Sequence, residues 1–383
     1  MKKLLQVLSY ILVAALASAV TFGICLIGQE RETGKLERLD ELIDRMFIGE
    51  SDAVAREDAA AEAMVSSLGD RWSYYIPASR YGAYKEQMNN AYIGIGVTIQ
   101  ADAASEGILI IKVEANGPAM EAGLEPGDLI VAVGQTRISG MTIAEVRELV
   151  KGKEGTYVEL TVVRSGAEQS FSVERRTVEV AVATGRMLEG DIGLVRIENF
   201  DARCASETVA VIRELMDQGA QGLIFDVRFN PGGYARELVK LLDFLLPEGE
   251  LFRTVDYAGR EQVDYSEADC LDIPMAVLVN ADTYSAAEFF AAALRDYDAA
   301  VIVGEQTVGK GYFQNTFALG DGSAVGLSIG KYYTPGGVSL EGVGITPDVE
   351  MDVDEQTLLA IYMGTLDPME DPQILAAMDA LKK

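Results

Sequence analysis

The stretch that decides the fold is Ala276-Val277-Leu278-Val279-Asn280-Ala281-Asp282-Thr283-Tyr284-Ser285-Ala286-Ala287-Glu288. Its first four residues are apolar and include two valines, which is typical of a buried strand. The alanine-rich residues from Ala286 onward favour a helix. Ser285 therefore lies where a strand gives way to a helix, and the N–H of Ala286 belongs to the first helical turn, whose donors have no partner within the helix. Serine is also a favoured helix N-cap, so this stretch alone leaves Ser285 either a nucleophile or a cap.

A second strand-to-helix junction lies upstream, in Gly222-Leu223-Ile224-Phe225-Asp226-Val227-Arg228-Phe229-Asn230-Pro231-Gly232-Gly233. The adjacent glycines Gly232 and Gly233 allow the backbone to turn sharply and to approach a ligand closely. Exposed N–H groups near the start of a helix suit an anion or an oxyanion. An ordinary turn between a strand and a helix explains the same spacing, so the sequence leaves both interpretations open.

A third segment, Gly304-Glu305-Gln306-Thr307-Val308-Gly309-Lys310-Gly311, matches the first part of a phosphate-binding loop. That loop needs Ser or Thr after the lysine, where this chain has Gly311, and it needs a helix where residues 311–317 are typical of a strand. The segment therefore indicates a glycine-flanked turn around Lys310 and argues against a nucleotide site. An ordinary exposed lysine is the alternative interpretation of Lys310.

The chain of 383 residues contains no histidine. This excludes Ser-His-Asp and Cys-His catalysis and any zinc site with histidine ligands. If Ser285 is a nucleophile, its base must be a carboxylate, a lysine or a tyrosine, and Lys310 is a lysine in a suggestive place. We expect no metal and no cofactor. The formal net charge of −28 repels nucleic acid, so we expect no nucleic-acid partner.

Strand-like and helix-like stretches alternate over residues 177–350, which predicts an α/β layer structure. Strands are expected at Ile192–Ile197, 222–227, Met275–Val279 and 301–303, and helices at 205–218, 234–246 and 285–297. Residues 91–176 contain short β-branched runs between turns and one amphipathic helix at 142–150, which indicates a compact β-rich module. Residues 31–90 are mostly helical in pattern, with a packed turn at 68–75 around the single tryptophan. Residues 351–383 are expected to form a helical tail.

Residues 4–27 carry no charge and are almost entirely apolar. As a helix they would be about 36 Å long, enough to cross a bilayer core of about 30 Å. Lys2 and Lys3 precede them, so the basic end is expected to stay in the cytoplasm and residues 31–383 to lie outside. We favour a retained single-pass anchor in residues 1–30 over a cleaved signal peptide, although Ala17-Ser18-Ala19 resembles a cleavage site.

Taken together, the three segments resemble the carboxyl-terminal processing peptidases, which are S41 serine peptidases with a PDZ domain and a Ser-Lys catalytic pair. Residues 226–233 resemble the family's Asp-Leu-Arg-Asn-Asn-Pro-Gly-Gly, residues 279–288 its nucleophile segment, and residues 304–314 its lysine segment. The resemblance implies that Ser285 is the nucleophile, that Lys310 is the general base and that Gln314 orients this base. The family usually has Ser-Ala where this chain has Thr283-Tyr284, and this departure bears on substrate specificity.

The resemblance also implies the fold: an N-terminal membrane helix, a helical N-terminal region at 31–90, a PDZ domain at 91–176 and an α/β, crotonase-like peptidase core at 177–350. In the PDZ domain, a peptide tail would add as a β-strand, and a loop would bind its C-terminal carboxylate. The loop residues are Tyr92, Ile93, Gly94, Ile95 and Gly96. In the core, the N–H groups of Ala286 and of Gly232 or Gly233, with a slight preference for Gly232, would hold the oxyanion.

We therefore expect an exported, membrane-anchored serine endopeptidase that cleaves proteins near their C-termini, with the PDZ domain recognising an exposed apolar tail. One alternative is a non-catalytic PDZ adaptor on a peptidase-like scaffold, which would bind tails without turnover. Another is an acyl-transferring or hydrating enzyme of the crotonase type, which would have no use for Lys310 or for the PDZ module. A homodimer formed through the helical residues 33–88 and 354–381 is expected from the family resemblance alone.

Overall fold

The computed structural model describes residues 34–88, 90–101, 107–114, 117–267 and 270–382. These fall into two units, one ending at Met64 and the other spanning Val65–Lys383. In the first unit, α2 (Lys35–Met46) and α3 (Ala53–Ser66) are joined by ion pairs from Arg56 to Asp40 at 2.8 Å and to Asp44 at 2.6 Å. The predicted membrane segment, 4–27, lies outside the described residues. Within them, no helix has both the length and the apolar character needed to span a bilayer.

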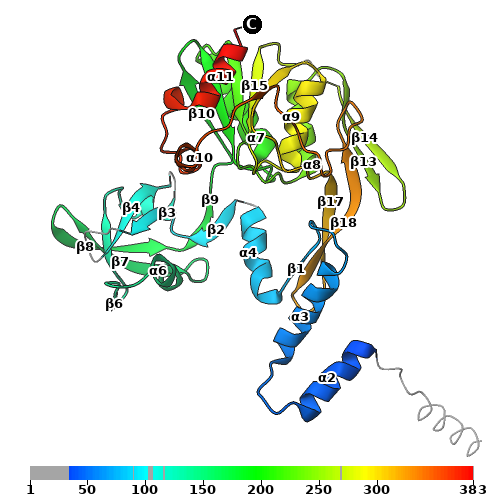
Figure 1. Cartoon of the computed structure of the whole chain (residues 1–383). Coiled ribbons are helices and arrows are strands. Elements are labelled where there is room, and N and C mark those ends of the chain that lie inside the picture. The colour runs from blue at the N-terminus through cyan, green and yellow to red at the C-terminus, as the bar shows by residue number, and fades with distance from the viewer. Residues whose placement is uncertain (1–33, 89, 102–106, 115–116, 268–269, 383) are drawn as a thin grey trace, which may run out of the picture. The chain divides into compact units, whose positions relative to one another are not determined.

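The second unit is built around a six-stranded sheet with the strand order β10-β11-β12-β15-β16-β19. Figure 1 labels β10 and β15 of this sheet. Neighbouring strands are parallel except for β10, which pairs antiparallel with β11. The strands are β10 (Ala183–Leu188), β11 (Ile192–Ile197), β12 (Gly222–Asp226), β15 (Met275–Val279), β16 (Ala300–Gly304) and β19 (Val349–Glu350). The α/β layer predicted from the sequence is therefore present, with β11 and β15 at the expected bounds.

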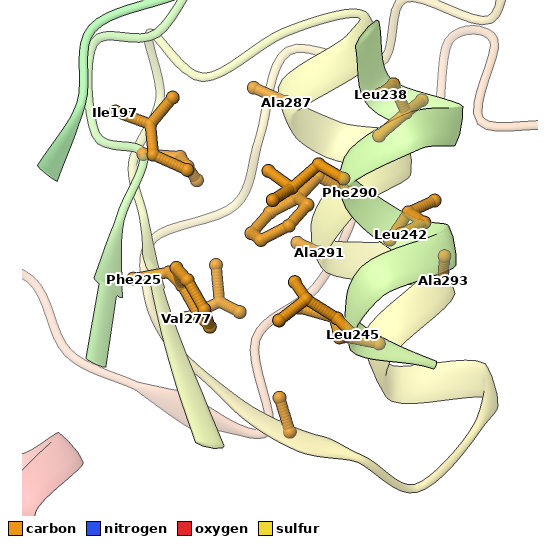
Figure 2. Packing of buried hydrophobic residues seen from close by; sticks show 14 of the residues in the cluster. Ile197, Phe225, Leu238, Leu242, Leu245, Val277, Ala287, Phe290, Ala291 and Ala293 are labelled. Carbon is orange, nitrogen blue, oxygen red and sulfur yellow. The ribbon is translucent and has the colours of Figure 1, made fainter. Parts of the chain in front are cut away.

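Both faces of this sheet are buried under helices, and successive strand residues point to opposite faces. On one face, Phe225 and Val277 pack against α7 (Cys204–Asp217), α8 (Ala235–Leu245) and α9 (Ala286–Asp296), and Phe225 meets Phe290 of α9 edge to face with ring centroids 5.3 Å apart (Figure 2). On the other face, Ile224 and Leu278 pack against α11 (Pro372–Ala380). This two-sided burial fixes where β15 ends and α9 begins, and thus where Ser285 lies.

The C-terminal tail is tied to β12 by a buried ion cluster around Arg228. Arg228 bonds Asp226 at 2.7 Å and Asp371 at 2.8 Å, and it also donates to the side chain of Gln373 at 2.9 Å. All four residues are almost fully buried. The tail itself contains α10 (Glu355–Tyr362), the 3-10 turn η1 (Pro368–Glu370) and α11, in agreement with the predicted helical tail.

A second sheet has the order β1-β18-β13-β14, with β17 also paired to β18. Its strands are β1 (Tyr74–Ile76), β13 (Gly249–Asp256), β14 (Glu261–Ser266), β17 (Tyr312–Ala318) and β18 (Ala324–Tyr333). Strand β1 comes from the region expected to be mostly helical, which otherwise contains α2, α3 and α4 (Ala78–Met88). Because β1 pairs with β18, the turn just before it, residues 70–73, is carried to the peptide segment that leads into β17.

The β-rich module is a sheet ordered β3-β4-β5-β7-β8, with β6 paired to β5, and a separate ribbon of β2 and β9. The elements are β2 (Ala91–Gly94), β3 (Val97–Ala101), β4 (Ile108–Val113), α5 (Pro118–Glu121), β5 (Leu129–Val133), β6 (Thr136–Arg137), α6 (Ile143–Val150), β7 (Tyr157–Arg164), β8 (Ala167–Glu174) and β9 (Arg176–Glu179). The predicted helix at 142–150 is α6, which begins with a Thr142–Glu145 capping box. Strand β3 lies at the edge of its sheet.

Candidate active site

Ser285 occupies a sharp elbow between β15 and α9. Its φ of 60° and ψ of −129° are rarely adopted by a residue with a side chain, and such a conformation costs about 1–3 kcal/mol. Hydrogen bonds on both sides maintain the elbow: the N–H of Tyr284 donates to the carbonyl of Asn230 at 3.1 Å, and the N–H of Ser285 donates to Glu288 Oε2 at 2.9 Å. The sequence placed Ser285 at this junction correctly, but the strained backbone is visible only in the structure.

Gly232 lies directly against this elbow. A Cβ atom added to Gly232 would come within 2.7 Å of the Ala286 nitrogen and 2.8 Å of the Ser285 Cβ, and the φ of Gly232 is +84°. No side chain fits such a place, so the position requires glycine. The structure therefore brings Gly232, Ser285 and Ala286 together, although more than fifty residues separate the two segments in the sequence.

The N–H groups around the elbow differ in whether they already have a hydrogen-bond acceptor. The N–H of Gly232, the glycine favoured slightly from the sequence, donates to Asn230 Oδ1 at 2.8 Å. The N–H of Phe200 donates to the carbonyl of Gly232, and the carbonyl of Phe200 accepts from the N–H of Tyr234. This parallel bridge turns the N–H of Gly233 away from Phe200. No described residue accepts a hydrogen bond from the N–H of Gly233 or of Ala286. These two donors are the ones left for a developing negative charge.

Lys310 lies in the loop between β16 and β17. Its Nζ is 5.1 Å from the ring centroid of Trp72 and 5.8 Å from that of Tyr284, and the two rings stack 6.4 Å apart. No hydrogen bond joins the Lys310 amine to the Ser285 hydroxyl in the described part of the chain. The structure thus brings Lys310 beside the residue that precedes Ser285, with its amine resting on aromatic rings, a contact worth about 0.5–2 kcal/mol to a charged amine.

The environment of Lys310 acts on its pKa in two directions. Burial disfavours the charged ammonium and lowers the pKa of Lys310 below its ordinary value of 10.5. The carboxylates of Asp70, Glu341 and Glu288 oppose this shift because they favour the positive charge. The net direction is downward, which is the direction that a lysine base needs near neutral pH.

The turn at 70–73 covers the lysine loop, and sequence reasoning did not assign it to the site. Arg71 Nη2 donates to the carbonyls of Val308 and Gly309, each at 3.1 Å. Trp72 Nε1 donates to Glu341 Oε1 at 3.0 Å, and Glu341 Oε2 accepts from the N–H of Gly311 at 2.8 Å. The sequence signalled only a packed turn around a single tryptophan, because nothing local indicates that β1 pairs with a strand some 250 residues later.

Gln314 lies on β17, opposite Ser328 of β18. Its side-chain amide donates to Ser328 Oγ at 3.0 Å and to the carbonyl of Tyr312 at 3.2 Å. Within the residues that the structure describes, Gln314 and Lys310 share no hydrogen bond. The structure therefore places Gln314 on the strand that follows the lysine loop, turned toward β18.

The predicted peptide-binding residues of the β-rich module divide between a strand and a link. Tyr92, Ile93 and Gly94 belong to β2 and pair with β9, whereas Ile95 and Gly96 form the connection to β3. A Cβ added to Gly94 would approach the Tyr92 ring to 2.5 Å, so that ring would have to move, and Gly96 has a φ of +76°. The module accordingly presents a glycine-containing turn at the start of an edge strand.

Two family models match separate parts of the chain. The family model described as "Peptidase family S41" matches residues 191–351, and the model described as "PDZ domain" matches residues 109–164. The first match contains Gly232, Gly233, Ser285, Lys310 and Gln314, and the second begins after the predicted carboxylate-binding turn.

Two curated relatives match most of the chain. The carboxy-terminal processing protease CtpA of Bacillus subtilis (strain 168) is 32% identical over 373 residues, which cover 94% of this chain and 80% of the relative. The carboxyl-terminal-processing protease of Synechocystis sp. is 30% identical over 329 residues, 84% of this chain and 76% of the relative. A solved structure assigned to the S41 proteases, from Bacteroides fragilis, shares the fold with a TM-score of 0.56 at 18% identity, covering 90% of this chain and 96% of that one.

Proposed function

The chain belongs to the carboxyl-terminal processing proteases, serine peptidases of family S41, and from this premise we propose that Ser285 and Lys310 are its catalytic pair. A serine peptidase needs a nucleophilic hydroxyl and a base to take its proton. Ser285 stands on a strained elbow at the N-terminus of α9, and the loop of Lys310 is packed against that elbow. The juxtaposition of this elbow with the lysine loop is the observation that carries the proposal.

Lys310 is proposed as the general base and later the general acid. Burial lowers its pKa, so that a larger share of the amine is neutral than in an exposed lysine. To reach the Ser285 hydroxyl, the long Lys310 side chain rotates off the Trp72 and Tyr284 rings. It takes the hydroxyl proton as Ser285 attacks the peptide carbonyl, and it gives that proton to the leaving amine. Gln314 is proposed to orient the amine once it has left the rings.

The oxyanion of the tetrahedral intermediate is proposed to bind the N–H groups of Ala286 and Gly233. Neither donor has an acceptor among the described residues, whereas the N–H of Gly232 is held by Asn230. Donors fixed in place before the reaction stabilise developing charge without reorganisation, and one such donor is worth about 100- to 1,000-fold in kcat. Gly232 is assigned the role of the spacer that allows the two backbones to approach.

The PDZ domain is proposed to recognise the C-terminal tail of a protein substrate. Its strand β3 has a neighbour on one side only, so a tail can add there as a further strand between β3 and α6. The turn at Ile95 and Gly96 lies at the start of β3, where the C-terminal carboxylate of the tail would bind. An exposed apolar tail fits this mode, because side chains of an added strand alternate between the domain and solvent.

We also propose that the peptidase acts outside the cytoplasm, on exported proteins, as an endopeptidase near their C-termini. The support is the apolar segment 4–27, which follows Lys2 and Lys3. A protease added to intact cells or spheroplasts tests this placement: the catalytic part should be digested, while a cytoplasmic marker protein should stay intact.

The catalytic proposal is tested with Ser285→Ala and Lys310→Ala in the full-length chain. An unstructured protein with an apolar tail serves as substrate, and products are identified by mass spectrometry. Both variants should lose cleavage while still folding, as shown by a cooperative thermal unfolding transition. Lys331→Ala is the matched control, because Lys331 also places its Nζ over a tyrosine ring, Tyr312, at 5.8 Å, and its loss should leave activity intact.

Two results would overturn the proposal. Full activity in either Ser285→Ala or Lys310→Ala would remove that residue from the mechanism. Binding of tails by the wild-type chain with no cleavage of any substrate would restore the adaptor hypothesis. The tail proposal has its own test: a peptide with a free C-terminal carboxylate should bind Ser285→Ala more tightly than the same peptide with a C-terminal amide.

A further inference from the structure

A buried carboxylate, that of Glu288, lies between the nucleophile segment and the lysine segment. Glu288 is the third residue of α9 and is fully buried. Its Oε2 accepts from the N–H of Ser285 at 2.9 Å and from the N–H of Lys310 at 2.8 Å. Its Oε1 accepts from the N–H of Gly309 at 2.8 Å and from the hydroxyl of Thr307. One side chain thus receives four donors, and two of them are the backbone groups of the proposed catalytic pair.

This arrangement requires a carboxylate. Both Glu288 oxygens act only as acceptors, each for two donors, which uses the lone pairs that an ionised carboxylate offers. A glutamine has the same shape but replaces one oxygen with an NH2 group, which would face two further donors. One of the two pairs of donors would then be buried without an acceptor, and this would destabilise the elbow or the lysine loop.

The two segments that Glu288 joins come from different elements, and they are also linked by the pairing of β15 with β16 and by one direct backbone bond. One is the elbow at the start of α9, and the other is the loop from Thr307 to Lys310, in which the N–H of Val308 donates to the carbonyl of Thr283 at 3.2 Å. Because catalysis depends on the distance between hydroxyl and amine, a residue that ties both backbones to one point sets that distance.

We propose, on the basis of the proposed Ser-Lys pair, that Glu288 is a positioning residue for this reaction. It fixes the backbone of the nucleophile to the backbone of the base, and its negative charge acts on the Lys310 amine. It touches neither substrate nor the reacting atoms, and its effect passes through Ser285 and Lys310.

The charge of Glu288 gives this role a signature that a purely structural residue lacks. The groups that face Lys310 are Asp70 of the N-terminal turn, Glu341 of the segment after β18 and Glu288 of α9, and all three raise the pKa of Lys310 against the effect of burial. Arg71 also approaches this loop, through the carbonyl of Gly309. Removing the charge of Glu288 therefore lowers the pKa of Lys310 and moves the rising limb of the pH–rate profile to lower pH.

The test compares Glu288→Gln with Glu237→Gln in the full-length chain. Glu237 is a matched control because it is also buried and is also the third residue of its helix, α8, but it bonds Lys240 and the N–H of Ala205. In Glu288→Gln we expect kcat to fall about 100-fold, KM to change little and the rising limb to move to lower pH. Glu237→Gln should keep the wild-type kcat and the wild-type pH profile.

Glu288→Asp keeps the charge but shortens the side chain by one methylene. It should lose kcat while its rising limb stays near the wild-type position, and it carries the test if Glu288→Gln does not fold. A wild-type kcat in either folded variant, or an unmoved limb in Glu288→Gln, overturns the inference. Lys310→Ala separates the two failures: if it stays active, the Ser-Lys proposal fails, whereas if it is inactive and Glu288→Gln behaves as wild type, only the role of Glu288 fails.

Discussion

The close approach of Gly232 to the elbow makes Gly232→Ala the sharpest perturbation that the site offers. The new Cβ would lie 2.7 Å from the Ala286 nitrogen, about 0.7 Å short of the 3.4 Å at which ordinary contact begins. The backbone of the elbow, or that of Gly232, must shift by a similar amount. A displacement approaching 1 Å costs about 100-fold in rate, equivalent to about 2.7 kcal/mol of barrier. We therefore expect kcat to fall about 100-fold.

Gly320→Ala separates this effect from backbone strain. Gly320 lies in the turn between β17 and β18 with a φ of +79°, close to the +84° of Gly232, but an added Cβ would meet no atom within 4 Å. Both substitutions force alanine into the left-handed region, and this strain should cost each about 1–2 kcal/mol of unfolding free energy, to which the clash adds a further loss in Gly232→Ala only. The assay is kcat on a tailed model substrate, with thermal unfolding measured in parallel. Equal losses of kcat in the two variants, or a wild-type kcat in Gly232→Ala, would refute the steric argument.

Four further outcomes are expected. Arg228→Met leaves two buried aspartates without their cation and should lower the unfolding free energy by about 3–5 kcal/mol, whereas Arg260→Met, at an exposed ion pair, should change it far less in urea titrations. The kcat/KM of the wild type should rise with pH through a pKa below 10.5, because the Lys310 base must lose its proton, and Lys310→Arg should be inactive at every pH. Since the folded pKa of Lys310 is depressed, Lys310→Met should gain stability over the wild type at low pH, and this gain should vanish above pH 10.5. In the native chain a thiol reagent should modify the exposed Cys270 and spare Cys204, whose burial raises its pKa, and mass spectrometry of the labelled peptides shows which cysteine reacts.

The part of the fold that the sequence predicts well is the part buried on both faces. Strands β11 and β15 are continuous apolar runs, and α7, α8 and α9 follow a clear helical pattern, so local composition alone locates them to within a residue or two. The hairpin of β13 and β14 was not predicted, because its strands mix charged and apolar residues without a clear alternation, and β14 is partly exposed. Local pattern cannot distinguish such strands from a loop.

The site divides in the same way. Ser285 and the paired glycines lie at junctions that turn and helix signals mark, whereas the cover that Trp72 places over Lys310 depends on β1 pairing with β18 far along the chain. The Ser-x-x-Glu spacing of Ser285 and Glu288 is the pattern of a helix capping box, and it was a local sign that Glu288 faces the elbow. The second oxygen of Glu288 also accepts a hydrogen bond from the lysine loop. This contact depends on tertiary structure, so the local sequence does not reveal it.

The ribbon of β2 and β9 has a consequence for how such a chain can change over evolution. The strand that enters the PDZ domain and the strand that leaves it run side by side, and at the base of the ribbon the N–H of Val180 donates to the carbonyl of Asn90 at 2.9 Å. The two ends of the inserted domain are therefore one hydrogen bond apart. A domain attached in this way can be lost, replaced or grafted from another protein with a single short splice, and the hydrolytic core keeps every strand of its own sheets. In this architecture the PDZ domain and the peptidase core can therefore be inherited separately.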